Sequence, residues 1–216
     1  MKLVREKEIF KGASVANISG KEISLITDFS GGDVFGFAPI SSRYIELRYS
    51  DEKKVPALYA SLDGGAKFGE SGVVTDVIPL KAFKKAGYLS MSSMVEATGQ
   101  NVRLTVRLAG FDKSGKEHVY VAEGEVKVGE WQELHFDVKD FLKKLDGDTI
   151  TLAVTAESSA SDTETTGLWI SKIGTSAPNK AEFPFWIIWV VIGLAVVGGL
   201  TAFVIWFRKN YTFVRE

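Results

Sequence analysis

Apolar and polar residues alternate along three segments of the chain. In residues 101–108 (NVRLTVRL) every second position is Val or Leu, and polar residues occupy the positions between them. Residues 131–138 (WQELHFDV) and 149–156 (TITLAVTA) repeat this pattern. A period of two with one apolar face is typical of antiparallel strands that bury one side of a sheet. The pattern therefore predicts strands in which Phe136 faces a core and His135 faces the opposite side.

The rest of the first 174 residues reads as further strands separated by turn-rich sequences. The additional strands are expected at 14–18, 22–29, 43–49, 57–62, 72–79, 88–96, 118–128 and 167–173. Two short segments, 80–86 and 138–145, have helical character, and Asp146-Gly147 ends the second of them. About ten strands at this spacing, with no long amphipathic helix, predict an all-β fold, an antiparallel β-sandwich over residues 1–174.

Residues 183–207 (FPFWIIWVVIGLAVVGGLTAFVIWF) contain no charged side chain. As an α-helix this segment is about 37 Å long, enough to cross a hydrocarbon core of about 30 Å. Trp186 and Trp206 lie near its two ends, where indole rings favour the membrane interface. A soluble helix of this length would need a polar face, which this segment lacks, and a buried core helix is the alternative. The sequence predicts one transmembrane α-helix at 183–207, after a linker at 175–182 and before a short tail at 208–216.

Positive charges around this segment predict its orientation. Arg208-Lys209 and Arg215 follow it, whereas Lys172 and Lys180 precede it. Cations favour the cytoplasmic side, so we expect a single-pass plasma-membrane protein with the sandwich outside and a cytoplasmic C-terminus. The first residues, MKLVREKEIFKG, lack the apolar stretch of a signal peptide. If Met1 is the native start, a tail-anchored protein with a cytosolic sandwich is the alternative. If the chain is a mature protein or a piece of a larger one, the outside placement holds.

Composition narrows the possible chemistry. The chain has no cysteine and two histidines, which excludes thiol catalysis, disulfides and thiolate zinc sites. The formal net charge of -1 gives no basis for nucleic-acid binding. The acids occur in turns without a spacing that singles out a catalytic pair, and His118 and His135 are interpreted as solvent-facing strand residues. We therefore expect a protein that is not an enzyme and has no cofactor.

Part of the chain resembles a known superfamily. Its most characteristic part is Gly129-Glu-Trp-Gln-Glu-Leu-His-Phe-Asp137, followed by a short helix and a final Leu168-Trp-Ile170 strand. This arrangement is similar to carbohydrate-binding-module jelly rolls of the galactose-binding-like superfamily, over about residues 8–174. The resemblance implies a jelly-roll sandwich, in a superfamily whose modules bind glycans, proteins or no known ligand. Such modules often hold a structural calcium through an acid after the last strand, but here Ser171 and Lys172 follow Ile170, which puts that site in doubt.

Exposed aromatic rings are the candidate glycan contacts, because sugar CH groups stack on their negative π faces. With Ile45 and Leu47 facing inward, Tyr44 is expected to point outward and Tyr49 inward. Tyr59 and Phe68 flank the loop at 63–65 and are expected to form a rim platform. Together with Tyr44 they are the candidate ligand-binding residues. The alternative is that these rings fill or cover the core. Trp131 is interpreted as a structural residue that caps one end of the sandwich.

Two further sites are candidates from residue type alone. Asp28 and Asp33 lie in turns and could contribute oxygens to a calcium site, although no ordered calcium-loop motif is present. The predicted membrane helix carries small residues that let helices approach closely in lipid, which predicts a membrane-protein partner. These small residues are Gly193, Ala195, Gly198 and Gly199.

The leading hypothesis is a membrane-anchored, non-catalytic β-sandwich. It would bind a cell-envelope or extracellular polysaccharide, or act as the accessory module of a glycan-handling membrane complex. The alternative is a structural or assembly subunit of a membrane complex that binds no sugar, including a tail-anchored version. An enzyme with an unrecognised site is a third, weaker hypothesis.

Overall fold

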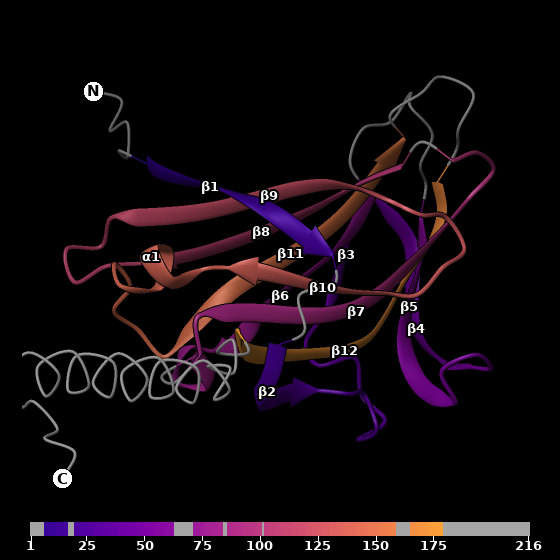
Figure 1. Ribbon diagram of the computed structural model, residues 1–216, viewed down its shortest axis with the longest axis horizontal. Coiled ribbons are helices and arrows are strands. Elements are labelled where there is room, and N and C mark those ends of the chain that lie inside the picture. Colours follow the sequence, from indigo (N-terminus) through magenta and orange to yellow (C-terminus); the bar gives the residue numbers. More distant parts are fainter. Residues whose placement is uncertain are drawn as a thin grey trace, which may run out of the picture. The chain divides into compact units, whose positions relative to one another are not determined.

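The computed structural model describes residues 7–16, 20–62, 71–83, 86–100, 102–158 and 165–178. Strands dominate this part of the chain (Figure 1), with one 3-10 turn, η1 (Leu80–Phe83), and one helical turn, α1 (Lys139–Leu142). The strands are β1 Lys7–Ala16, β2 Gly20–Thr27, β3 Ala38–Ile40, β4 Ser42–Ser50, β5 Val55–Leu62, β6 Ser71–Pro79, β7 Tyr88–Ala97, β8 Val102–Phe111, β9 Glu117–Val126, β10 Gln132–Asp137, β11 Thr149–Ser158 and β12 Thr165–Pro178.

The strands form two sheets that pack as a sandwich, as the alternating pattern predicted. The first sheet has the order β3-β6-β11-β8-β9-β1, and the second has the order β1-β10-β7-β12-β5-β4. β1 belongs to both sheets: residues 7–13 pair in parallel with β9, and residues 14–16 pair antiparallel with β10. β12 pairs with β7 along most of its length. It also pairs with β5 through residues 167–170 and with β2 through residues 173–178.

The core lies between the two sheets and confirms the predicted registers. The alternate apolar residues of β8 and β11 are all buried, and Phe136 of β10 is only 1% exposed. Arg103 and Arg107, which alternate with the buried residues of β8, are exposed. Burial of one apolar face on each sheet is the main favourable contribution to the stability of such a sandwich.

The elements differ from the expectation in several places. β1 begins at Lys7, well before the expected residue 14, because its first half pairs with β9 despite its three charged residues. β3 was not expected, since three residues carry no readable period. The two helical segments shrink to single turns. β12 continues to Pro178, so the residues expected in the first half of the linker are part of a strand. They pair with β2 up to Pro178 and with β7 up to Ser176.

The predicted membrane segment at 183–207, the small residues within it and the tail at 208–216 lie outside the described residues. Within the part of the chain that is described, no helix has the length and apolar character needed to cross a bilayer. The described residues belong to one compact unit.

Candidate functional site

An aromatic cluster lies on the outer face of the second sheet. Leu58 and Ala60 of β5, like Leu168 and Ile170 of β12, are buried in the core, so the residues between them face the other way. These residues are Tyr59 and Trp169, which are register partners across the two strands. Their ring centroids are 4.8 Å apart, at an interplanar angle of 58°. Strand pairing therefore holds the two rings side by side on one face.

Arg48 of β4 extends this cluster to the edge of the sheet. Its guanidinium carbon lies 3.7 Å from the centroid of the Tyr59 ring and 5.9 Å from that of Trp169. The Arg48 Nε donates to Glu46 at 2.5 Å, and its Nη2 donates to the Tyr44 hydroxyl at 3.1 Å. The Tyr44 ring lies 6.3 Å from that of Tyr59. Arg48 is thus fixed over the aromatic rings by a carboxylate and a phenol, an arrangement that favours cation–π attraction.

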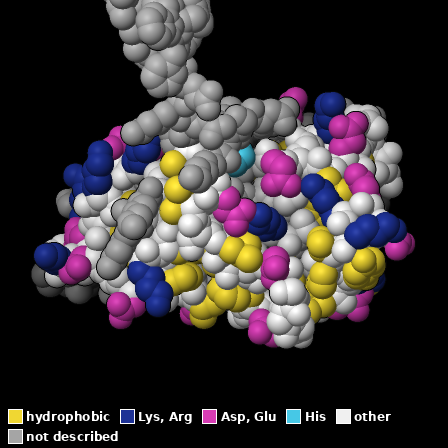
Figure 2. Space-filling model, turned by 60° about the horizontal axis from the view of Figure 1, so that its bottom comes forward, with side chains coloured by type: hydrophobic (Ala, Val, Ile, Leu, Met, Phe, Trp, Pro, Cys, Tyr) yellow, Lys and Arg dark blue, Asp and Glu magenta, His cyan; other side chains and the backbone are white. Residues whose placement is uncertain are grey.

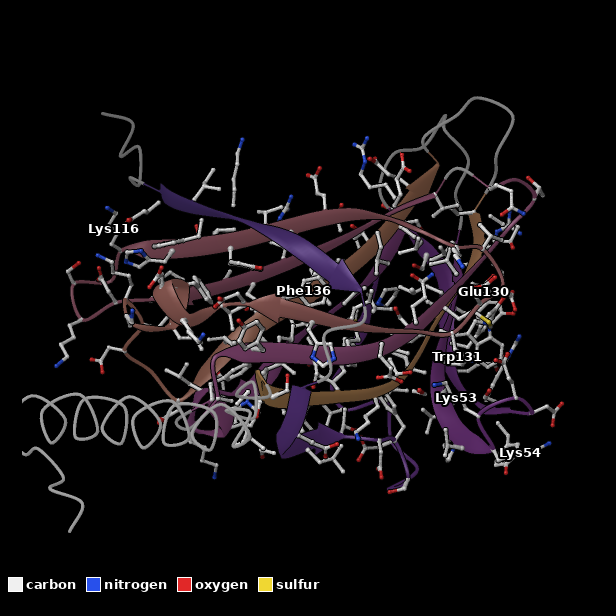
Figure 3. All side chains as sticks on the ribbon, in the orientation of Figure 1. Lys53, Lys54, Lys116, Glu130, Trp131 and Phe136 are labelled. Atoms are coloured by element: carbon white, nitrogen blue, oxygen red, sulfur yellow. The ribbon has the colours of Figure 1, made fainter. Side chains whose placement is uncertain are left out.

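Residues from two distant segments close the other side of the cluster. Trp131, which precedes β10, has its ring centroid 6.4 Å from that of Trp169. Lys53, in the turn after β4, forms an ion pair with Glu133 of β10 at 3.1 Å, and its Nζ lies 5.7 Å from the Trp131 ring (Figure 3). Because β12 and β7 separate β5 from β10 by about 14 Å, this ion pair reaches across the face.

Hydrogen-bonding groups lie among the rings. Glu96 of β7 accepts a hydrogen bond from the Trp169 indole nitrogen at 2.8 Å. Burial raises the pKa of the Tyr59 hydroxyl, and the nearby Glu96 carboxylate raises it further against the opposing effect of Arg48. Tyr59 therefore stays a neutral hydroxyl under physiological conditions. The face combines flat apolar rings with carboxylate acceptors and guanidinium donors.

The same face continues with buried polar residues. His135 of β10 is 9% exposed, and its Nδ1 lies 3.0 Å from the Ser176 hydroxyl. Burial lowers the pKa of His135, although Glu133 opposes this shift. Among the described residues, the Ser92 hydroxyl is buried and has no hydrogen-bond partner. Ser92 pairs in register with Lys172, whose ammonium contacts Glu22 of β2.

The predicted aromatic contact residues differ in their exposure in the structure. Tyr44 is 45% exposed on the outer face, in the predicted direction. Tyr59 lies on the same face but is 7% exposed, so it forms part of the floor and not of a rim. The inward placement of Tyr49 is wrong: it is 60% exposed, because it lies next to the turn at the end of edge strand β4. Phe68 lies outside the described residues. Sugar contact by Tyr44, Tyr59 and Phe68 stays a prediction.

Sequence reasoning did not select Trp169 or Glu96 as site residues. Trp169 was considered only as part of a fold signature, and Trp131 only as a structural cap. The alternation of Leu168, Trp169 and Ile170 could have placed Trp169 outward, because both flanking residues suit a core. The sequence could not predict that Trp169 lies near Tyr59 and Trp131, because this proximity depends on the order of the strands and on the course of the chain before β10.

Both histidines are buried, so their interpretation as solvent-facing residues is wrong. His135 does lie on the face opposite Phe136, as the period predicted, but that face is covered at this point. His118 is 3% exposed, and its Nε2 lies 3.0 Å from Asp112 Oδ2. Its Nδ1 lies 3.3 Å from a Glu8 carboxylate oxygen of β1. His118 lies on the face of β9 that carries the core residues Tyr120 and Ala122. Its ring lies 6.2 Å from that of Phe10 in β1, whose pairing with β9 the sequence did not indicate.

The turn acids considered for calcium hold the backbone of their own loop. Asp28 Oδ1 accepts hydrogen bonds from the Ser30 amide at 3.0 Å and the Ser30 hydroxyl at 2.6 Å. The Ser30 side chain lowers the pKa of Asp28. Asp33 Oδ1 accepts from the Phe35 amide at 2.6 Å. In the described residues no group of three or more His, Cys, Asp or Glu side chains is arranged to hold a metal ion.

Charge is mixed over the surface. On the face drawn in Figure 2, acidic and basic side chains are interspersed with small apolar groups. This arrangement matches the near balance of 26 basic and 27 acidic residues in the sequence. The face in Figure 2 therefore does not present the continuous basic patch that a polyanion such as a nucleic acid requires.

Comparison with known proteins yields structural likenesses alone. No family model matches the chain, and no curated protein matches it. The fold is similar to carbohydrate-binding-module β-sandwiches. One is the C-terminal family 22 carbohydrate-binding module of Clostridium thermocellum Xyn10B, at a TM-score of 0.49 and 13% identity over 77% of this chain and 99% of that one. Another is the family 28 module, specific for non-crystalline cellulose, at a TM-score of 0.48 and 9% identity over 76% and 97% of the two chains.

A larger protein also matches over part of its length. The chain covers 30% of the Clostridium thermocellum xylanase 10B piece that contains the CBM22-1 and GH10 modules in complex with xylohexaose. That likeness has a TM-score of 0.47 and 16% identity over 76% of this chain. At these scores and identities the likenesses concern the sandwich fold and indicate no ligand.

Proposed function

We propose that the chain is a membrane-anchored, non-catalytic β-sandwich that binds a cell-envelope or extracellular polysaccharide on the outer face of its second sheet. The observation that carries this proposal is the cluster of Tyr44, Tyr59, Trp169 and Trp131 with Arg48 stacked among them. A sugar ring offers CH groups to the faces of aromatic rings and hydroxyls to charged groups at its edge. Both kinds of partner occur together on this face.

The stacking order assigns different roles to the rings. The Arg48 guanidinium already lies over the Tyr59 ring at 3.7 Å, so Tyr59 supports the site from below. Trp169, Trp131 and Tyr44 are then the rings that contact sugar, with Arg48, Glu46 and Glu96 as partners for hydroxyls. Adjacent rings are inclined by 54° to 68°. Inclined rings cannot form a flat platform, which favours a single polysaccharide chain over a crystalline surface.

Binding to soluble polysaccharides tests the site. The full chain in mild detergent would be titrated with xylan, glucans and purified cell-wall polysaccharide by affinity electrophoresis and calorimetry. We expect Trp169→Ala and Trp131→Ala each to lower affinity about tenfold, the effect of losing roughly 1–1.5 kcal/mol of ring contact. Phe111→Ala is the matched control, because Phe111 is a half-exposed ring that ends β8 of the first sheet. Binding that Trp169→Ala leaves unchanged, or no binding to any polysaccharide, contradicts the proposal.

We also propose that the segment at 183–207 crosses the plasma membrane, with the sandwich outside and residues 208–216 in the cytoplasm. The support is the uncharged segment and the Arg208-Lys209 pair directly after it. Protease added to intact cells is expected to digest the sandwich and leave a small protected fragment. A sandwich that survives until the membrane is permeabilised contradicts this topology and, with it, access to extracellular sugar.

A further inference from the structure

A cavity at one end of the sandwich lies apart from the aromatic face. It has a volume of about 830 Å³ and is lined by residues of η1, α1 and the turn before β11. Two backbone hydrogen bonds hold these segments: the Leu80 amide donates to the Asp148 carbonyl at 2.9 Å, and the Val138 amide donates to the Gly87 carbonyl at 3.0 Å. The cavity is therefore formed by backbone that is tied to the strands of both sheets.

The lining divides into an apolar floor and a basic rim. Leu80, Phe83 and Leu142 supply apolar surface, with Phe83 buried and the two leucines partly buried. Three lysines, Lys81, Lys139 and Lys143, line the same cavity and are exposed. Asp148 is the one acid among the lining residues that the structure describes. An apolar floor beneath several ammonium groups suits an amphiphile with an anionic head.

The three lysines differ in whether they form ion pairs with nearby carboxylates. Lys143 forms an ion pair with Asp140 at 2.8 Å, and the Lys139 Nζ lies 3.9 Å from Asp137. Lys81 has no ion pair with any described residue. The Lys139 stem packs against Gly87, where an added Cβ would meet Lys139 Cε at 2.2 Å, and its ammonium lies 4.7 Å from the Tyr88 ring. Lys139 is thus positioned at the rim, and Lys81 offers a charge that no described residue neutralises through an ion pair.

The last described strand ends beside this cavity. Ser176 of β12 pairs in register with Tyr88, and the Thr175 hydroxyl donates to the Ala82 carbonyl of η1 at 3.1 Å. Four residues, 179–182, separate the end of β12 from the predicted membrane segment. Four extended residues span at most about 14 Å. A chain that enters the bilayer at residue 183 therefore brings this end of the sandwich close to the lipid headgroups.

We infer that this cavity binds the headgroup of an anionic glycerophospholipid from the membrane in which the chain is anchored. The phosphate lies among Lys81, Lys139 and Lys143, and the glycerol and upper acyl carbons contact Leu80, Phe83 and Leu142. A free phosphate ion would make no use of the apolar floor, and a neutral sugar would make little use of three ammonium groups. The inference rests on the proposed membrane segment and is independent of sugar binding.

The experiment uses the full chain in nanodiscs of phosphatidylcholine with increasing fractions of phosphatidylglycerol. Because the chain has no cysteine, Lys144→Cys allows a single fluorophore beside the cavity. Quenching of this fluorophore by headgroup-labelled lipid is expected to rise with the phosphatidylglycerol fraction. Adding Lys81→Gln and Lys139→Gln is expected to weaken this response by about fivefold for each lysine removed. Inorganic phosphate in solution is not expected to compete.

Controls separate the possible failures. A fluorophore at Lys54→Cys, on the β4–β5 turn at the opposite end in Figure 3, is expected to show no dependence on phosphatidylglycerol. Lys54→Gln with Lys127→Gln removes two lysines elsewhere, since Lys127 is exposed and pairs with Glu130 at 3.3 Å, and should leave the response at Lys144→Cys unchanged. A response that the cavity lysines do not affect, or one abolished by inorganic phosphate, overturns the inference. A chain that does not insert into nanodiscs overturns the inference and the anchor together, while polysaccharide binding is measured separately.

Discussion

At the scale of single residues, the two neighbours Phe136 and His135 show what alternation predicts and what it leaves open. Phe136 points into the core, as the period of two required. His135 points the other way, but it is buried and bonded to Ser176. The sequence specifies which face of the sheet a side chain occupies. It does not specify whether another segment covers that face.

Replacing Phe136 by Ala is expected to destabilise the sandwich by about 3–5 kcal/mol, because it removes a ring that is almost fully buried and leaves a cavity. Chemical denaturation followed by circular dichroism measures the change. Phe111→Ala is the control, because that ring is half-exposed at the end of β8, and it should cost less than about 1 kcal/mol. Equal costs for the two substitutions would contradict the core assignment.

The buried His135 predicts a pH dependence of stability. Its pKa is lowered by burial, so between the folded pKa and the ordinary value of about 6.5 the unfolded chain binds more protons than the folded chain. Stability therefore falls as the pH decreases below about 6.5. His135→Gln removes this contribution, so the difference between the parent protein and the variant should change across that range in denaturation experiments. A difference that is constant with pH would show that His135 does not titrate in this way.

At the scale of elements, the close pairing of β6 with β11 depends on a residue without a side chain. A Cβ added at Gly72 would lie 2.0 Å from the Val154 carbonyl oxygen and 2.7 Å from the Thr155 Cα. Both atoms belong to the backbone and cannot move without disturbing the ladder. Gly72→Ala is therefore expected to destabilise the protein by about 1–3 kcal/mol.

Gly31→Ala is the matched control for this glycine. A Cβ at Gly31 would meet no atom within 4 Å. Thermal unfolding of the two variants should show a clear loss for Gly72→Ala and a change within about 1 kcal/mol for Gly31→Ala. Two equal losses would indicate that backbone flexibility, and not the contact with β11, is the reason for glycine at 72.

The strands were predicted correctly where apolar residues alternate. They were missed where a segment forms a strand only because it pairs with a distant one. β8, β10 and β11 are close to their expected bounds because each carries a clear period of two. The first half of β1 and residues 175–178 of β12 were missed, because their strand state comes from neighbours distant in sequence. The alternation within β4 predicted the face on which Tyr44 lies. It could not predict that Arg48, Trp169 and Trp131 lie near Tyr44, because that depends on the order of the strands.

At the scale of the whole molecule, the sandwich is complete within the described residues. Both sheets, the shared strand β1 and the core lie before residue 179. A chain that stops after Pro178 is therefore expected to remain in solution and to unfold cooperatively, with the far-ultraviolet spectrum of an all-β protein. Size-exclusion chromatography and thermal unfolding test this. Aggregation of this shorter chain in every buffer would mean that residues 179–216 are needed for folding.

The sharing of β1 between the two sheets has a consequence for the order of folding during synthesis. β1 leaves the ribosome long before its partners β9 and β10, which belong to the second half of the sequence. Contacts between segments so distant in sequence form slowly, because the intervening loop must be closed before they are made. Residues 7–13 of β1 therefore stay unpaired until β9 has emerged, and residues 14–16 stay unpaired until β10 has emerged. We expect this strand to be a binding site for chaperones in the nascent chain until it pairs with both sheets.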